Sequence, residues 1–190
     1  MKTTSTLIFA FLFFQISGQS VDTIRLKSTF FRLQQEDNEV NQRNYFNLFP
    51  TSFDDFIQTF GFNSGIDVGP LYHNSYDYVL RFFALNKIPV SKQIEKWIDI
   101  SIGGKWEADA VNHFLHNLRP RILKDIDITY NILKTKSDKE IESFFYFFFS
   151  GIHPPYERIP DNFCKIKIND TEFYTLIVKG YKLAIKDSGH

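Results

Sequence analysis

The stretch from Ser137 to Tyr156, SDKEIESFFYFFFSGIHPPY, is the densest apolar segment beyond the first twenty residues that also has start and stop signals. Ser137 and Glu140 match the Ser-x-x-Glu capping box, in which each side chain bonds the other residue's backbone N–H. Gly151 favours a left-handed helix end, and the two prolines after His153 prevent the helix from resuming. The stretch therefore predicts a helix from Ser137 to Ser150.

Six aromatic residues occupy positions 144–149 of this helix without interruption. At about 100° per residue their rings point in nearly all directions, so we expect other helices to surround this one. Such a run is also compatible with a β-strand, but the capping box and the glycine stop favour the helix. We predict an all-α protein, a compact bundle of short helical hairpins around this central aromatic helix.

Apolar residues recur at helical spacing on both sides of the central helix. We expect further helices over 22–35, 52–61, 75–85, 90–102, 105–118, 120–130 and 170–184, a polar linker over 36–44 and a loop over 61–70. The loop's glycines, at 61, 65 and 69, do not have the spacing of a phosphate-binding loop. Positions 162–168 fit a strand and a helix equally, and no internal repeat is visible.

The composition is that of a globular chain with an unusually aromatic core. The 190 residues include 22 Phe, and 22 basic residues balance 22 acidic ones. A neutral chain lacks the concentrated positive field that nucleic acid requires, so nucleic acid is not an expected partner. We expect one helical domain over 19–190 with a frayed tail over 186–190. Cys164 is the only cysteine, which precludes an internal disulfide.

Positions 1–18 have the layout of a secretory signal peptide. Lys2 precedes an apolar block over 7–14, and small or polar residues follow it. The block is too short to span a membrane, although an uncleaved N-terminal anchor is the alternative reading. We expect the remaining chain to be exported, to the periplasm or the exterior, without membrane insertion. The shortage of cysteine favours a bacterial envelope.

The expected helix over 105–118 carries the main candidate binding residues. Its apolar residues share one side, and the opposite side carries Asp109, Asn112, His113 and His116. Asp109 and the two histidines could approach a metal ion, but the His-Glu-x-x-His pattern of zinc helices is absent. A solvated polar face that a partner could contact is the simpler interpretation. We predict neither a metal nor a cofactor.

Two further residues are candidates for acid–base chemistry. Glu107 lies near the apolar side of the same helix, where burial would raise its pKa, although it could equally cap the helix at Gly104. His153 follows the central helix and could be a general base, a pH-sensitive contact or a turn residue that bonds free carbonyls. Sequence alone does not bring either residue to a partner.

Two classes of function follow. The first is an exported binding protein that acts through protein–protein interaction, such as an inhibitor or an immunity-type protein; its contacts would include Asp109, Asn112, His113, His116 and His153. The second is a small exported hydrolase in which Glu107, Asp109 and His153 act as acid–base groups. The chain has no nucleophile elbow, metal motif or cofactor fingerprint, so binding is the preferred hypothesis. The oligomeric state is not indicated.

Overall fold

The computed structural model describes residues 21–63, 67–153 and 155–188. The predicted signal peptide over 1–18 lies outside these ranges. No helix among the described residues is long and apolar enough to cross a membrane.

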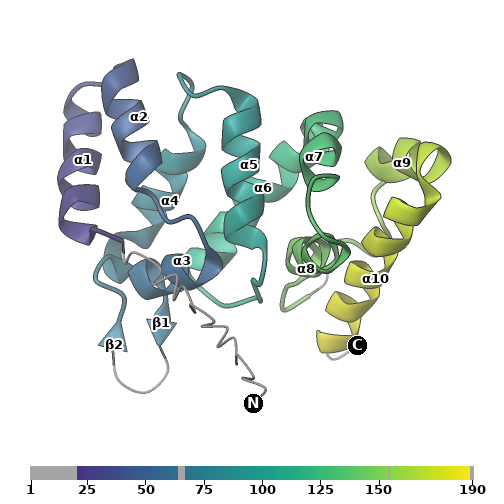
Figure 1. The fold of residues 1–190 in the computed structure, drawn as a ribbon. Helices are drawn as coiled ribbons and strands as arrows, with labels where there is room; N and C mark the ends of the chain where they lie inside the picture. Colours follow the sequence, from purple (N-terminus) through teal and green to yellow (C-terminus); the bar gives the residue numbers. More distant parts are fainter. Residues whose placement is uncertain (1–20, 64–66, 154, 189–190) are drawn as a thin grey trace, which may run out of the picture.

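The described residues form ten α-helices, two 3₁₀ turns and one small β-ladder (Figure 1). In chain order the elements are α1 (Thr23–Gln35), α2 (Glu39–Leu48), α3 (Phe53–Phe60), β1 (Phe62–Asn63), β2 (Asp67–Val68), η1 (Tyr72–Asn74), α4 (Ser75–Phe83), α5 (Val90–Ser101), α6 (Ala110–Lys124), α7 (Ile126–Leu133), α8 (Asp138–Phe149), η2 (Asp161–Phe163), α9 (Cys164–Asn169) and α10 (Thr171–Asp187). The predicted all-α fold is confirmed. The only strands among these residues are β1 and β2, an antiparallel pair of two residues each.

The central aromatic helix is α8, and its start is the predicted one. The Ser137 N–H donates to Glu140 Oε2 at 2.8 Å, and the Glu140 N–H donates to Ser137 Oγ at 3.4 Å. The strand alternative is therefore wrong. The predicted left-handed helix end at Gly151 is also wrong. The C-cap residue is Ser150, and its backbone is extended, with φ −69° and ψ 150°. Among the described glycines only Gly103 has positive φ, so Gly151 is not left-handed.

Other helices enclose α8 on most sides. Its five phenylalanines are at most 1% exposed, and Tyr146 is the only one of its six aromatic residues that reaches the surface. The Phe147 ring lies 5.5 Å from Phe53 of α3 and 6.3 Å from Phe114 of α6, while Phe149 lies 5.1 Å from Tyr181 of α10. Figure 1 shows α6 on one side of α8, α10 on the other side and α7 above it. Five of the six consecutive aromatic rings are therefore buried, although they point in different directions.

The packing of α10 on α8 depends on a glycine. A Cβ at Gly180 would lie 2.7 Å from both the Phe145 Cβ and the Tyr146 backbone nitrogen. Only glycine allows the two backbones to approach this closely. Further along, the Tyr146 hydroxyl donates to Asp187 Oδ2 at 2.9 Å. Lys186 and Asp187, the first residues of the expected frayed tail, are thus part of α10.

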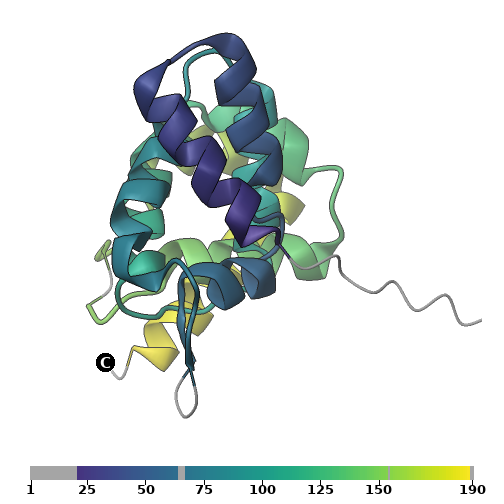
Figure 2. The ribbon, with the colours of Figure 1, turned by 90° about the vertical axis from the view of Figure 1, so that its left-hand side faces the viewer.

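A second aromatic cluster fills the space between α1, α2, α3 and α4. Phe49 stacks on Phe82 with ring centroids 3.8 Å apart, and Phe30 stacks on Tyr78 at 4.2 Å. Figure 2 shows α1 in front of this half of the molecule. Phe114 connects the cluster to α8, since it contacts rings of α3 and α4 as well as Phe147.

The predicted linker over 36–44 is wrong, because most of it belongs to α2. Asn38 caps this helix by accepting from the Asn41 N–H at 2.8 Å. Gln42 is fully buried: its amide donates to Asp37 and Asn86, and its Oε1 accepts from the Asn86 and Lys87 backbone N–H groups. The buried side of α2 is partly polar, so no apolar repeat indicated a helix there.

Two predicted boundaries of the helix over 105–118 are also wrong. The α6 helix begins at Ala110, so Glu107 is not in its first turn and does not cap it at Gly104. It then continues through Pro120 to Lys124 and does not end before the proline. Leu118 and Ile122, on either side of Pro120, are both fully buried, which holds the helix together across the missing N–H.

The segment over 162–168, for which strand and helix were equally compatible, is helical. Its first residues belong to η2 and the rest to α9. Asp170 then caps α10 by accepting from the Phe173 N–H at 3.0 Å, as predicted.

Candidate functional site

The predicted binding residues in and just before α6 lie beside aromatic residues that were not predicted as part of a site. Tyr76 of α4 contacts His113 edge to face, with ring centroids 4.8 Å apart. Further along, the Arg121 guanidinium donates to the Phe83 carbonyl at 3.1 Å. These two contacts show that α4 and α6 run side by side in the same direction. Their exposed faces therefore form one surface.

We call this surface the tyrosine–histidine face. Its members come from the short hairpin, η1, α4, α6 and the residue before α6, and are Phe62, Tyr72, Tyr76, Leu80, Asp109, Asn112, His113 and His116. Phe62 is 59% exposed, Tyr76 51% and Leu80 41%, which are high values for large apolar side chains. Asn112 and His116 are exposed, and His113 is half-buried. None of these eight residues is a lysine, an arginine or a glutamate.

Asp109 is the most strained residue of this face. Its backbone has φ 57° and ψ −114°, and it is the only non-glycine residue with positive φ among the described residues. Such a conformation costs about 1–3 kcal/mol and must be held by its surroundings. The Tyr72 hydroxyl donates to Asp109 Oδ2 at 2.7 Å, and this bond raises the pKa of Tyr72. Tyr72 thereby fixes the segment that leads into α6.

The candidate acid–base residues lie on two segments: Glu107 and Asp109 precede α6, and His153 follows α8. Glu107, in the segment before α6, pairs with Lys105 at 3.4 Å, and the Asp109 carboxylate accepts from Tyr72. His153 is exposed on the loop after α8. The hydrolase hypothesis requires a carboxylate that contacts a histidine, but the contacts of these two carboxylates are with a lysine and a tyrosine. These contacts therefore do not favour the hydrolase hypothesis.

No metal site is formed by the part of the chain that the structure describes, since no three His, Cys, Asp or Glu side chains are grouped suitably there. Cys164 is exposed at the start of α9.

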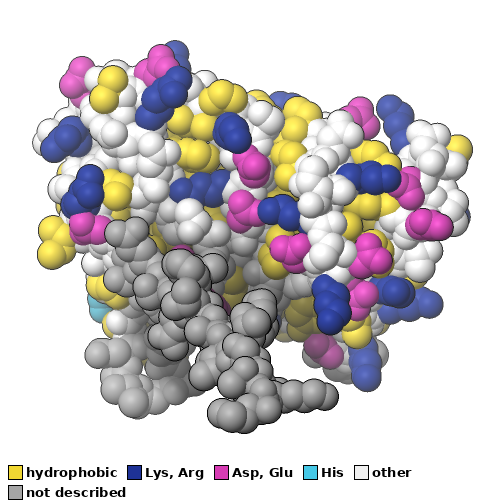
Figure 3. Space-filling model, in the orientation of Figure 1, with side chains coloured by type: hydrophobic (Ala, Val, Ile, Leu, Met, Phe, Trp, Pro, Cys, Tyr) yellow, Lys and Arg dark blue, Asp and Glu magenta, His cyan; other side chains and the backbone are white. Residues whose placement is uncertain are grey.

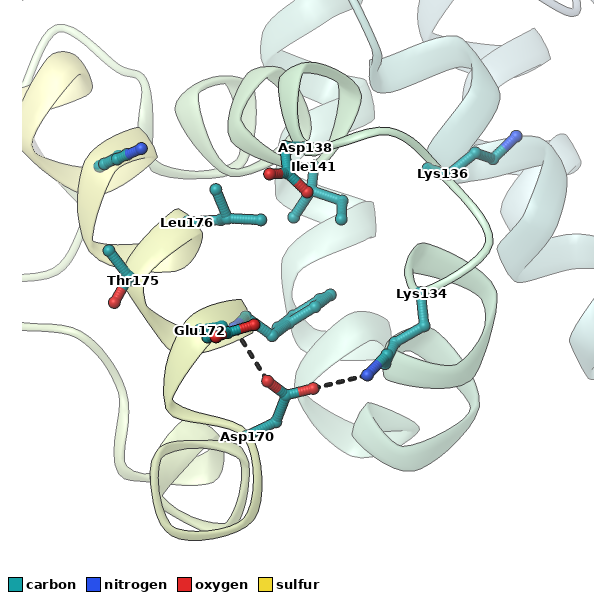
Figure 4. Close-up of a pocket in the computed structure, with 10 residues that line it drawn as sticks. Lys134, Lys136, Asp138, Ile141, Asp170, Glu172, Thr175 and Leu176 are labelled. Atoms are coloured by element: carbon teal, nitrogen blue, oxygen red, sulfur yellow. Dashed lines mark hydrogen bonds and ion pairs between the residues drawn. The ribbon is translucent and has the colours of Figure 1, made fainter.

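A charged cleft lies between the end of α7, the start of α8 and α10 (Figure 4). Its volume is about 420 Å³, and Asp170 lies at its rim. The Lys134 ammonium donates to Asp170 Oδ2 at 2.7 Å, and this bond, with those from the Phe173 N–H and the Tyr130 hydroxyl, lowers the pKa of Asp170 to about 2. Lys136, on the opposite rim, pairs with Asp99 of α5 at 2.6 Å. Both lysines thus connect neighbouring helices, so their presence in the cleft is explained by stability and does not require a ligand.

The fold and the tyrosine–histidine face together define an all-α protein with one surface rich in tyrosine and histidine. Comparison with known proteins adds no identification: the chain matches no protein-family model, no curated protein and no solved structure.

The polar side of one expected helix predicted Asp109, Asn112, His113 and His116. Tyr72 and Tyr76 were not predicted, because they belong to a different segment. Tyr76 lies at the edge of the buried side of α4, about 60° from the buried Val79 on the helical wheel, and it is nevertheless 51% exposed. An exposed tyrosine on an otherwise amphipathic helix was the available signal, but its position beside His113 depends on the tertiary fold.

Proposed function

We propose that this chain is an exported, non-enzymatic binding protein that recognises a protein partner through the tyrosine–histidine face. The observation that supports the proposal is the composition of this face. Protein interfaces are enriched in aromatic residues and depleted of lysine and glutamate at their centres, and tyrosine is frequent among the residues that dominate binding energy. On the side of the molecule that Figure 3 shows, basic and acidic side chains are interspersed.

The geometry of the face supports the same proposal. Tyr72 is held by Asp109 and Tyr76 by its contact with His113, so both rings are oriented before a partner binds. Oriented side chains lose less conformational entropy on association, which improves affinity. The finer proposal is an inhibitor or immunity-type protein that neutralises an enzyme in the bacterial envelope. It rests on the export expected from positions 1–18 and on the size of the chain.

The test is affinity capture from the source organism with two matched variants. Leu80 and Leu183 are both 41% exposed, but only Leu80 belongs to the tyrosine–histidine face. We expect a stoichiometric partner with the wild-type protein and with Leu183→Ser, and its loss with Leu80→Ser and Tyr76→Ser. Equal capture by all four proteins would contradict the proposal. Inhibition of the captured partner's activity at a 1:1 ratio would test the finer proposal.

A further inference from the structure

A polar groove between α1 and α2 carries two arginines that are not neutralised within it. The groove has a volume of about 470 Å³ and is lined by Arg25, Ser28, Thr29, Arg32, Asn44, Asn47 and Leu48. None of these residues is acidic. The volume lies in the range typical of small-molecule sites, but the lining is mostly polar, which suits a polar ligand.

The lining follows from the periods of the two helices. Arg25, Ser28, Thr29 and Arg32 have the spacing i, i+3, i+4, i+7, so they share one side of α1. Asn44, Asn47 and Leu48 share one side of α2 in the same way. The two arginines are about 10 Å apart along the helix axis, with hydroxyl and amide groups between them.

The two guanidinium groups are available to a ligand. Arg32 makes no ion pair with any residue in the described ranges. Arg25 is 72% exposed and lies 3.9 Å from Asp22, whose other oxygen caps α1 by accepting from the Arg25 N–H. Basic side chains over α1 are visible in Figure 3.

The neutral residues of the groove indicate which chemical groups a ligand would place between the two arginines. Asn44 and Asn47 are exposed, and each side-chain amide offers both a donor and an acceptor. Ser28 Oγ donates to the Arg25 carbonyl at 2.9 Å, so its lone pairs remain available as acceptors. Sugar hydroxyls both donate and accept hydrogen bonds, so they match the donors and acceptors of Ser28 and the asparagines. A peptide is a poorer match, because Leu48 is the only apolar residue that lines the groove.

We infer that this groove binds an oligosaccharide that carries sulfate or phosphate groups. Arg25 and Arg32 would each bond one anionic group, and the asparagines and Ser28 would bond hydroxyls between them. Arginine suits this role because its planar guanidinium forms paired hydrogen bonds with such anions. The groove shares no residue with the tyrosine–histidine face, so each proposed site can be tested independently of the other.

The experiment is isothermal titration of the full chain with a sulfated tetrasaccharide, an unsulfated tetrasaccharide and inorganic sulfate at low salt. We expect binding of the sulfated compound only, weakened about tenfold by Arg25→Gln and by Arg32→Gln. Arg43→Gln is the matched control, because Arg43 lies on α2 but pairs with Glu39 at 2.6 Å outside the groove. Circular dichroism melting curves verify that each variant is folded.

Three results would overturn the inference. The first is the absence of heat at millimolar sulfated tetrasaccharide. The second is equal weakening by Arg43→Gln, since that would mean non-specific attraction to positive charge. The third is equal affinity for inorganic sulfate, since the neutral residues of the groove would then contribute nothing.

Discussion

At the residue scale, Asp109 connects the strain in the backbone to the tyrosine–histidine face. Its positive φ and its bond to Tyr72, 37 positions away, cannot be inferred from sequence. Aspartate tolerates positive φ better than most residues, but only the tertiary structure demands it here. By contrast, the positions of Asn112, His113 and His116 on one helix face follow from the helical period alone and were predicted.

The strain at Asp109 can be measured by comparing two variants that both remove the carboxylate. We expect Asp109→Gly to be more stable than Asp109→Ala by about 1–2 kcal/mol, because only glycine adopts positive φ without steric cost. Urea denaturation of both variants gives the difference directly. An alanine variant as stable as the glycine variant would mean that the segment relaxes to negative φ.

The buried Lys96 should make the stability of the protein depend on pH. It is 8% exposed, and its ammonium donates to the Phe46 carbonyl and lies 4.8 Å from the centre of the Phe46 ring. Burial lowers its pKa from 10.5 to about 8, although the charge of Asp99 partly opposes this effect. Between these two pH values the unfolded chain retains the proton and the folded chain releases it, so stability rises with pH in this window.

The appropriate comparison is with Lys96→Met, which keeps an apolar stem but does not titrate. We expect the stability of the wild-type protein relative to this variant to increase by up to about 3 kcal/mol from pH 8 to pH 10.5. The buried Tyr45 has a raised pKa and destabilises the fold at high pH, but it is present in both proteins, so its contribution cancels. A difference that does not change with pH would contradict the assignment.

At the scale of single helices, local signals were reliable where the sequence itself supplied the hydrogen bonds. The capping box of α8 and the caps of α3 and α10 involve residues three positions apart, so they could be predicted. The prediction failed for α2, where Asn41 and Gln42 occupy buried positions that are normally apolar. It also failed at Pro120, where burial of the neighbouring turns outweighs the local preference to end the helix.

The end of α8 depends on a side chain from another helix. Arg119 of α6 is largely buried, which lowers its pKa to about 10, and its guanidinium donates to the Phe148 and Ser150 carbonyls. The last turn of α8 contains no basic residue of its own. Arg119 therefore bonds the free carbonyls and opposes the negative end of the helix dipole.

We expect Arg119→Met to lower the free energy of unfolding by about 2–3 kcal/mol, because two carbonyls lose a charged donor. Arg119→Lys should recover only part of this loss, since an ammonium cannot match the two-pronged geometry. Arg158→Met is the control: Arg158 is exposed and pairs with the exposed Asp161, so its effect should stay within about 0.5 kcal/mol. Denaturant titration compares the three variants, and equal effects of Arg119→Met and Arg158→Met would refute the role of Arg119.

The contact of α8 with α10 gives the second prediction at this scale. Gly180→Ala should destabilise the protein by about 2 kcal/mol, because the new methyl group has no room between the two backbones. In an uncrowded helix the same change would stabilise by up to about 1 kcal/mol. Lys182→Ala, at an exposed position two residues further along α10, is the control. Thermal unfolding reports both, and a stabilised Gly180→Ala variant would show that the helices are further apart.

At the scale of the whole molecule, the aromatic residues form two groups that Phe114 and Phe147 connect. One group surrounds α8, and the other fills the space between α1 and α4. The sequence indicated the first group, because its rings are consecutive. The second group is assembled from single phenylalanines of several helices, so its existence depends on the tertiary arrangement. The same holds for the tyrosine–histidine face, which requires α4 and α6 to be neighbours.

The central claim is that the chain folds around an enclosed aromatic helix, and native-state hydrogen exchange tests it most directly. Amides buried in the most stable part of a protein exchange only when the whole molecule unfolds. We predict that the amides of Phe144 to Phe149 exchange with the free energy of global unfolding measured in urea. Exchange of these amides at a much lower free energy than those of α1 or α4 would contradict the claim.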